Sequence, residues 1–373
     1  MFRILFAFLL LAHGLIHVLG FVNQWHLAAV RQMTNKTLIP VAVVTSKWLG
    51  LCWLLISLGF LVALVGYWFR HDWWQTVALV SVILSQALII LYWTDARTGT
   101  VGNVLILLAL GLSYAHTQFE QRADSEAQQL MSQEASDKTI VTQSMLVGLP
   151  TPVQQWLTTS GVVGKERVHT VRLRQHGLMR TSPDGQWLPT EAEQYIGVDE
   201  PGFIWKADVR MLSFLPLAGR DKYANGKGNM LIKALSVLPI VNASDAKTDQ
   251  GTLLRYLGEM CWYPSAALSP FITWQSIDAY HAQATMTYKG VSASAIFMFD
   301  EQHRLAGVSA KRYKGSGAES QLADWYIPVR DWKLMDGVTI PVKGDVIWKL
   351  PAGDFNYYQW EITDIDYNKP VLY

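Results

Sequence analysis

The longest apolar stretch of the chain is VAVVTSKWLGLCWLLISLGFLVALVGYWF, residues 41–69. A helix needs about 20 residues at 1.5 Å each to cross roughly 30 Å of hydrocarbon. Three further apolar stretches, residues 4–22, 74–93 and 98–115, meet or approach that length, and the chain beyond residue 116 contains none. The sequence therefore predicts a bundle of four membrane-spanning helices in residues 1–116, followed by a water-soluble domain.

Composition and charge exclude several classes of function. Half of the 373 residues are apolar, 16% are charged and the formal net charge is +1, which leaves no basic footprint for a nucleic-acid partner. Cys52 lies inside the second apolar stretch and Cys261 in the soluble part, so we expect no disulfide between them and no thiolate zinc site. The soluble domain must therefore be held together by its own core.

The Lys and Arg residues near the apolar stretches favour one orientation in a membrane. The side of the first and third connections carries Arg31, Lys36, Lys47 and Arg97. The opposite side carries one fewer, Arg3, Arg70 and Arg122. By the positive-inside rule this margin places the first and third connections in the cytoplasm. We therefore predict a multi-pass protein of the cell inner (plasma) membrane whose soluble domain is extracytoplasmic.

Two histidines stand four residues apart in the first apolar stretch. His13 and His17 therefore share one face of the predicted helix. Polar residues inside a span are costly, so each is a functional candidate. One interpretation is a metal, haem or quinone site, and the other is hydrogen bonding between neighbouring helices. No carboxylate lies at a matching depth to complete a metal site, so we predict no metal and no cofactor, with His13 and His17 as weak metal candidates.

The composition changes after the last apolar stretch. Residues 117–139, HTQFEQRADSEAQQLMSQEASDK, are polar and indicate a linker or a solvated extension of the last helix. We therefore predict three segments: a four-helix transmembrane domain in residues 1–116, this linker or extension, and a soluble β-rich domain in residues 140–373. An amphipathic helix that starts near Pro152 and ends near Gly161 opens that last segment.

The soluble segment is dominated by strand patterns. Apolar and polar residues alternate over 168–176, and residues 186–198 and 203–211 are also strand-like. The dipeptides Lys289-Gly290 and Asp336-Gly337 are typical of the two-residue turns of hairpins. About ten strands at short spacing predict an α+β domain, with a curved antiparallel sheet or half-barrel and a few covering helices.

Two segments interrupt the strand pattern. Asp249 is predicted to cap a helix over residues 252–260, in which Arg255 and Glu259 are four residues apart and can pair. A second short helix is predicted over residues 233–237. For Asp249, Arg255 and Glu259 two roles stay open, helix capping with a salt bridge or contact with a ligand. The run Arg220-Asp221-Lys222 is interpreted as surface charge pairing.

Several passages resemble an uncharacterised bacterial membrane family, a domain of unknown function with four N-terminal spans. They are His13-Gly14-Leu15-Ile16-His17, Trp93-Thr94-Asp95-Ala96-Arg97-Thr98-Gly99-Thr100, Leu149-Pro150-Thr151-Pro152-Val153-Gln154, Gly226-Lys227-Gly228, Asp249-Gln250-Gly251, Arg255-Tyr256-Leu257, Trp262-Tyr263-Pro264 and Ile340-Pro341. This resemblance covers most of the chain and implies no assigned activity. The strand order is also similar to the curved half-barrel of lipoprotein carriers of the bacterial envelope, a likeness of fold that does not fix function.

No catalytic motif stands out in the sequence. Ser, His and Asp are present, but no Gly-x-Ser-x-Gly elbow and no Cys/His signature occurs, so we predict no catalytic residue and favour a non-enzymatic role. Aromatic residues on the concave face of a curved sheet would instead line an apolar cavity. The predicted ligand-binding residues are Trp205, Arg210, Arg255, Trp262, Trp274 and Trp348.

These observations lead to one hypothesis and two alternatives. The hypothesis is an integral membrane protein whose extracytoplasmic β-rich domain binds a lipid or another amphiphile. The first alternative is a membrane redox or metal or haem enzyme that uses His13 and His17 in the bundle. The second is a sensor or assembly factor that binds another envelope protein. The partners expected from the sequence are thus membrane lipid, and an amphiphilic ligand or an envelope protein, with no nucleic acid.

Overall fold

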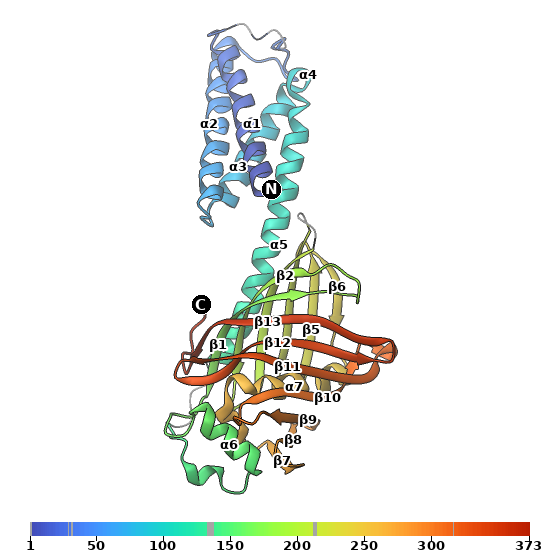
Figure 1. Cartoon of the computed structure of the whole chain (residues 1–373). Helices are drawn as coiled ribbons and strands as arrows, with labels where there is room; N and C mark the ends of the chain where they lie inside the picture. Colours follow the sequence, from blue (N-terminus) through green and yellow to red (C-terminus); the bar gives the residue numbers. More distant parts are fainter. Residues whose placement is uncertain (1, 29, 31–32, 133–137, 212–214, 316) are drawn as a thin grey trace. The chain divides into compact units, whose positions relative to one another are not determined.

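The computed structural model describes the chain except for residues 1, 29, 31–32, 133–137, 212–214 and 316. It contains two compact units, Met1–Thr117 and Gln118–Tyr373. The first unit is helical and the second is built around one curled sheet (Figure 1).

Four helices of the first part of the chain are long and apolar enough to cross a membrane. They are α1 (Phe2–Gln24), α2 (Val43–Trp68), α3 (Trp74–Leu91) and α5 (Gly99–Met131), with a single turn, α4 (Trp93–Ala96), before α5. The four predicted apolar helices are therefore confirmed. Their apolar side chains are exposed around the bundle, as Phe8 and Leu108 illustrate, which is the pattern of helices that face lipid.

The second unit contains an antiparallel sheet that has thirteen strands within the described part of the chain. The strands are β1 (Thr170–Met179), β2 (Leu188–Gly197), β3 (Gly202–Met211), β4 (Leu215–Ala224), β5 (Lys227–Ala234), β6 (Leu238–Ala243), β7 (Ile272–Ser276), β8 (His281–Tyr288), β9 (Val291–Phe299), β10 (Leu305–Lys314), β11 (Gln321–Met335), β12 (Val338–Leu350) and β13 (Gly353–Tyr367). Three more strands are present than the sequence patterns indicated.

The sheet consists of two meanders joined along one seam. Its strand order is β6-β5-β4-β3-β2-β1-β13-β12-β11-β10-β9-β8-β7, so strands adjacent in sequence pair, except where β1 pairs with β13. Helix α7 (Ala246–Glu259) connects the two meanders, and it lies inside the curl against β4 and β5 of one and β8, β9 and β10 of the other. The predicted half-barrel with a few covering helices is confirmed (Figure 1).

Tight turns hold the register of the hairpins. Lys289-Gly290 joins β8 to β9 and Asp336-Gly337 joins β11 to β12, and all four residues have positive φ. Positive φ at both central residues is the signature of a type I′ turn, whose twist matches that of the flanking strands. Both predicted hairpin turns are therefore confirmed.

Two helix predictions need correction. Residues 233–237 are not helical, because they form the end of β5 and the turn into β6, in which Leu235 and Ser236 have positive φ. The helix predicted over 252–260 begins at Ala246 instead. Its N-cap is Asp245, whose carboxylate accepts a hydrogen bond from the Thr248 amide at 2.7 Å. Asp249 in the first turn binds strand β5 instead, through the amide of Gly228 at 2.8 Å.

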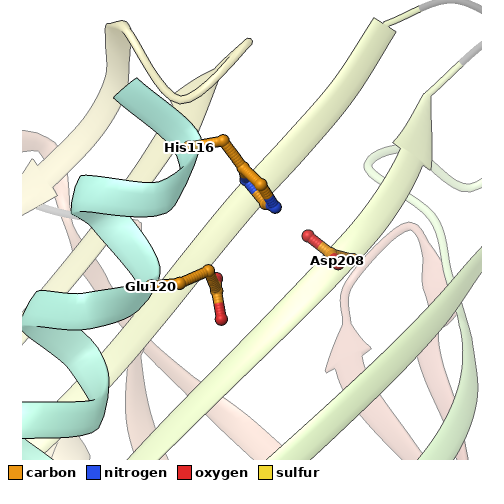
Figure 2. Close-up of side chains that lie close together, drawn as sticks. All are labelled: His116, Glu120 and Asp208. Atoms are coloured by element: carbon orange, nitrogen blue, oxygen red, sulfur yellow. The ribbon is translucent and has the colours of Figure 1, made fainter. Parts of the chain in front are cut away.

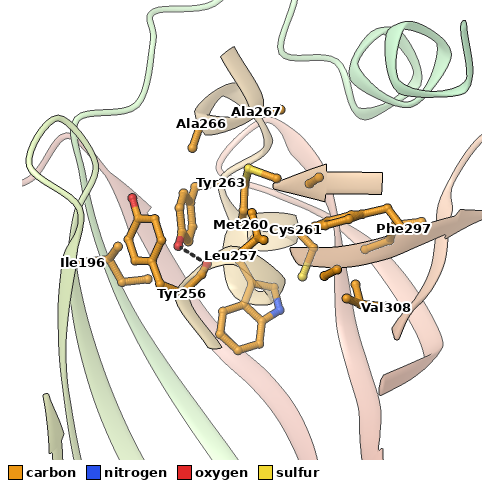
Figure 3. Close-up of a cluster of buried hydrophobic side chains, with 14 of the residues drawn as sticks. Ile196, Tyr256, Leu257, Met260, Cys261, Tyr263, Ala266, Ala267, Phe297 and Val308 are labelled. Carbon is orange, nitrogen blue, oxygen red and sulfur yellow. Dashed lines mark hydrogen bonds between the residues drawn. The ribbon is translucent and has the colours of Figure 1, made fainter. Parts of the chain in front are cut away.

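The core of the second unit lies between α7 and the sheet. Figure 3 shows Tyr256 and Tyr263 toward Ile196, and Phe297 and Val308 on the other side of the helical segment. The Tyr263 hydroxyl donates to the carbonyl oxygen of Tyr256 at 3.1 Å, so the buried phenol has a partner. The helix α6 (Thr151–Ser160), predicted near Pro152, packs on β8 and β12 and ends at Gly161 with φ +79°.

The outer face of β3 and β4 carries basic residues that meet the last turns of α5. Lys206 Nζ lies 2.5 Å from the Asp124 carboxylate and 3.4 Å from that of Glu193. In Figure 2, Glu120 on α5 and Asp208 on β3 lie close together, whereas His116, drawn in the same view, belongs to the first compact unit. Residues 118–131 are therefore a docked part of the second unit.

Candidate functional site

The inner face of the first meander is arranged in rows across the strands. Side chains of alternate residues point inward, and pairing puts one residue from each strand side by side. One row holds Gln194, Trp205, Asp221 and Met230 of β2 to β5. The next row holds Gln175 of β1 and Ala192, Ala207, Gly219 and Ile232 of β2 to β5. A further row, toward the β3–β4 end, holds Thr190, Val209, Leu217 and Ala234.

A cavity of about 390 Å³ lies between this inner face and α7. Gly219 of β4 lines it, and the absence of a side chain at this position leaves space between the sheet and the helix unfilled. A Cβ built on Gly219 would meet only the Ala207 carbonyl oxygen at 3.7 Å and the Trp205 ring at 3.8 Å, both ordinary contacts. The volume falls within the range of about 300–1,000 Å³ that is usual for small-molecule sites.

One end of the cavity is apolar and accessible. Its wall there is formed by Leu188, Val209, Leu217, Ile232 and Ile240. Ile240 on the edge strand β6 is 57% exposed, and Leu188 is half-buried. Gln175 and Asp221, by contrast, are 2% and 1% exposed. The apolar end is therefore the mouth.

The deep end of the cavity is polar and centred on Arg255 of α7, whose side chain is 15% exposed. The Arg255 guanidinium lies 2.6 Å from the carboxylate of Asp221 and 2.6 Å from that of Glu259, and donates to the Gln194 side-chain oxygen at 3.1 Å. Gln194 Nε2 in turn donates to Glu259 at 2.6 Å, which closes a ring of three side chains, Arg255, Gln194 and Glu259, to which Asp221 is joined through Arg255. The rings of Phe203 and Trp205 lie 4.8 and 5.0 Å from the guanidinium carbon, in the range of cation–π contacts.

Burial and charge act against one another in this network. Burial lowers the pKa of Arg255, but the carboxylates of Glu259 and Asp221 raise it more, so the net shift is upward. Burial also raises the pKa of Glu259, and the opposing effects of Arg255 and Gln194 leave it above its usual value. Arg255 is thus firmly charged and holds together two acidic groups that would otherwise be costly to bury.

Several polar atoms around the cavity lack a hydrogen-bond partner within the described residues. They are Gln175 Nε2, Asp221 Oδ1, Trp262 Nε1 and Arg312 Nε. Gln175 is 2% exposed and Asp221 1%, so bulk water does not reach them freely. A buried polar atom without a partner costs about 1–3 kcal/mol. Four such atoms around one cavity indicate a place that a polar molecule can occupy.

The structure brings together only some of the predicted ligand-binding residues. Trp205, Arg255 and Trp262 line the cavity. Trp274 lies elsewhere in the core, where its ring packs on Phe297 at 5.2 Å and its Nε1 donates to the Ala267 carbonyl. Trp348 stacks on Tyr357 at 5.8 Å and is not among the lining residues. Arg210 belongs to β3, and its side chain lies outside the described part of the structure.

Sequence reasoning missed Gln175, Gln194 and Asp221. The interpretation of Asp221 as a surface charge is wrong, because β4 turns it inward to Arg255. Its neighbours Arg220 and Lys222 point outward and pair with Glu126 at 3.4 and 3.0 Å. The alternation of a strand was the available signal. Successive side chains of a strand point to opposite faces, so Asp221 must point to the face opposite to Arg220 and Lys222.

The two histidines of the bundle are engaged in hydrogen bonds between helices. His13 Nε2 donates to Asn103 Oδ1 at 2.8 Å, and His17 Nδ1 donates to the His13 carbonyl at 2.7 Å. His17 Nε2 lies 2.7 Å from Ser85 Oγ, which supplies its hydrogen. The remaining nitrogen, His13 Nδ1, packs against Gly102, where a Cβ would come within 2.4 Å. This arrangement favours the packing interpretation of His13 and His17.

Comparison with known proteins identifies a family for the chain. The sequence model of a family of unknown function, DUF6544, matches residues 139–360. The chain belongs to this family. The matched region of the DUF6544 chain contains every residue that lines the cavity, from Gln175 to Trp360.

Other comparisons add little about this DUF6544 protein. No curated protein matches the chain. Seven chains of solved structures match, among them a domain assigned as an outer membrane lipoprotein-sorting protein from Vibrio parahaemolyticus. That match has 6% sequence identity and a TM-score of 0.33, and it covers 55% of this chain and 87% of the other.

Proposed function

We propose that this chain is a multi-pass protein of the inner (plasma) membrane whose half-barrel binds a lipid or another single-chain amphiphile without chemical conversion. The cavity between the inner face and α7 carries the proposal, because it has an apolar mouth and a polar deep end. A molecule with the same two parts would satisfy both. Trp205, Arg255 and Trp262 are the proposed contacts.

The rest of the chain supports a lipid rather than a water-soluble ligand. Four helices that can cross a membrane are part of the same polypeptide as the cavity. A protein held at a bilayer meets amphiphiles at high local concentration, which compensates for modest affinity. The proposed side for the half-barrel is extracytoplasmic, because the first and third connections carry the excess of Lys and Arg.

Filling the cavity tests the proposal. Full-length protein is purified gently, and its co-purifying lipids are extracted and quantified by mass spectrometry. We expect wild type to retain an amphiphile enriched over the bulk membrane lipids. Gly219→Val should lose most of that enrichment, because the new methyl groups enter the cavity without a backbone clash.

A matched variant separates binding from a general effect of valine. Thr287→Val places the same side chain at an exposed strand position of β8 and should retain the wild-type lipid. Identical lipid content in wild type, Gly219→Val and Thr287→Val would overturn the proposed function. A Gly219→Val protein with unchanged melting and no enriched lipid would support it.

A further inference from the structure

The polar deep end of the cavity carries information about the ligand's headgroup. Its unpaired atoms are of two kinds. Asp221 Oδ1 is an acceptor that needs a hydrogen, whereas Gln175 Nε2, Trp262 Nε1 and Arg312 Nε are donors that need a lone pair. Trp205 connects Gln175 with Asp221. Its Nε1 donates to Gln175 Oε1 at 3.4 Å, and Trp205 lies opposite Asp221 in the pairing of β3 with β4.

The chemistry of these atoms discriminates between headgroups. A carboxylate or phosphate accepts hydrogen bonds but has no hydrogen for Asp221 Oδ1 when fully ionised, and it would add negative charge beside Asp221 and Glu259. An ammonium group donates to Asp221 but cannot accept from Gln175 or Trp262. A hydroxyl does both. Because the unpaired atoms sit on different elements, a group with more than one hydroxyl fits them best.

The direction of insertion follows from the position of the polar atoms. They lie at the closed end, whereas the mouth is formed by Leu188, Ile240 and other apolar side chains. A hydrocarbon tail placed deepest would leave Asp221 Oδ1 and Gln175 Nε2 unpaired, at a cost of about 1–3 kcal/mol for each atom. A head placed deepest removes that cost and leaves the tail against the apolar mouth.

We propose that the half-barrel takes an uncharged, hydroxyl-bearing single-chain amphiphile of the monoacylglycerol type, headgroup first, with its hydroxyls between Asp221 Oδ1 and Gln175 Nε2. This inference rests on the proposed function. It goes beyond it in naming the class of headgroup and the end that enters.

Two buried glutamines of neighbouring strands offer a matched pair for the test. Gln194 is fully buried, and both ends of its amide are paired within the Arg255 ring. Gln175 is also buried, but its Nε2 has no partner among the residues that the structure describes. A purely structural role for Gln175 predicts that its loss destabilises the empty protein. A ligand role predicts that its loss weakens the binding of a hydroxyl-bearing probe but not that of a probe without a hydroxyl.

The experiment uses delipidated full-length protein in phosphatidylcholine nanodiscs, with empty nanodiscs as the background. Four probes share one oleyl chain: monooleoylglycerol, oleate, oleylamine and methyl oleate. We expect monooleoylglycerol to bind roughly 10-fold more tightly than each of the others, the ratio that one extra satisfied hydrogen bond provides. Gln175→Met should weaken the binding of monooleoylglycerol by about 3- to 10-fold and leave the binding of methyl oleate unchanged. The melting temperature of the empty protein should fall only slightly, because the two hydrogen bonds that Gln175 Oε1 accepts, from Trp205 and Tyr358, are both long at 3.4 Å.

Gln194→Met is the control variant. It should lower the melting temperature of the empty protein, because it removes the hydrogen-bond partner of both Arg255 and Glu259. If oleate bound most tightly, the proposal of an uncharged headgroup would be overturned. The carboxylate would then be expected to bind Arg312, whose Nε has no acceptor among the described residues. Equal binding of all four probes would overturn head-first insertion but leave the proposed function standing. Failure of every probe to bind would overturn the proposed function.

Discussion

The two compact units treat buried polar groups in opposite ways. In the helical unit, His13, His17, Ser85 and Asn103 satisfy one another across three helices. Among the described residues of that unit, Trp53 Nε1 is the one buried side-chain polar atom without a partner. Among the described residues of the second unit, eleven buried side-chain polar atoms lack a hydrogen-bond partner, and four of them belong to residues that line one cavity.

This difference distinguishes polar groups that bind one another from polar groups that are available to a ligand. A closed network holds helices together and has no capacity left for a ligand. An open set of donors and acceptors costs stability in the empty protein, and a ligand that satisfies them recovers that cost. The cavity is therefore the better candidate for binding, although the histidine pair is the more conspicuous feature of the sequence.

The largest effect is expected at Arg255. Arg255→Met leaves Asp221 and Glu259 buried without their cation, which should destabilise the half-barrel by about 3–5 kcal/mol. Thermal melting of the full-length protein, followed through the β-sheet signal, measures this loss. Lys311→Met, which breaks an exposed pair with Asp324, is the control and should cost at most about 1 kcal/mol.

The same variant should show a specific pH dependence. Burial raises the pKa of Glu259 in the folded protein, and loss of Arg255 raises it further. The folded state then holds a proton that the unfolded state releases above pH 4.5, so stability falls as the pH rises through the folded pKa. The loss of unfolding free energy caused by Arg255→Met should thus be larger at pH 8 than at pH 5. A loss that does not change with pH would contradict the raised pKa of Glu259.

A smaller effect is expected in the helical unit. Asn103→Ala removes the side chain that bonds to His13, Ser85 and Gln86, and should destabilise the bundle by about 0.6–1.7 kcal/mol. Melting in nanodiscs tests this, with the exposed Leu108→Ala as the control. Lipid retention by the half-barrel should not change. A loss of retained lipid in Asn103→Ala would show that the two kinds of polar cluster are not independent.

The smallest effect concerns the outer face of the sheet. Burial raises the pKa of Glu193, but hydrogen bonds from Tyr195 and Arg174 and the charge of Lys206 lower it more, so the net shift is downward. Its stabilising contribution is present above pH 4.5 and is lost as the pH falls below that value. The difference in unfolding free energy between Glu193→Gln and wild type should therefore become smaller as the pH falls, which melting at several pH values measures. A difference that grows toward low pH would contradict this prediction.

The sequence predicted the architecture better than the site. Length and apolarity alone located the four helices, and Lys289-Gly290 and Asp336-Gly337 located two hairpins, because both signals are local. Strands β4 to β7 were not predicted; in β4, Pro216, Gly219 and a run of charges weaken the alternation of apolar and polar residues. Tertiary pairing with β3, and not local propensity, makes β4 a strand.

The site depends on contacts between residues far apart in the chain. Arg255 and Trp262, which line the cavity, were among the predicted residues because a charge on a predicted helix and a tryptophan at its end are visible in a sequence. Gln175 and Gln194 could not be found that way, since their role follows from which strands meet and from the small residues Ala192, Ala207 and Gly219 beside them. A cavity forms where the side chains of several elements together do not fill the space between them, so no single position of the sequence predicts it.

Photo-crosslinking tests the central claim most directly. Full-length protein in nanodiscs is irradiated with a monoacylglycerol that carries a diazirine on its chain, and the labelled peptides are mapped by mass spectrometry. The account predicts labelling of the residues that form the mouth, Leu188, Val209, Leu217, Ile232 and Ile240, with the signal suppressed by Gly219→Val. Labelling confined to residues 3–115, unchanged by Gly219→Val, would contradict it.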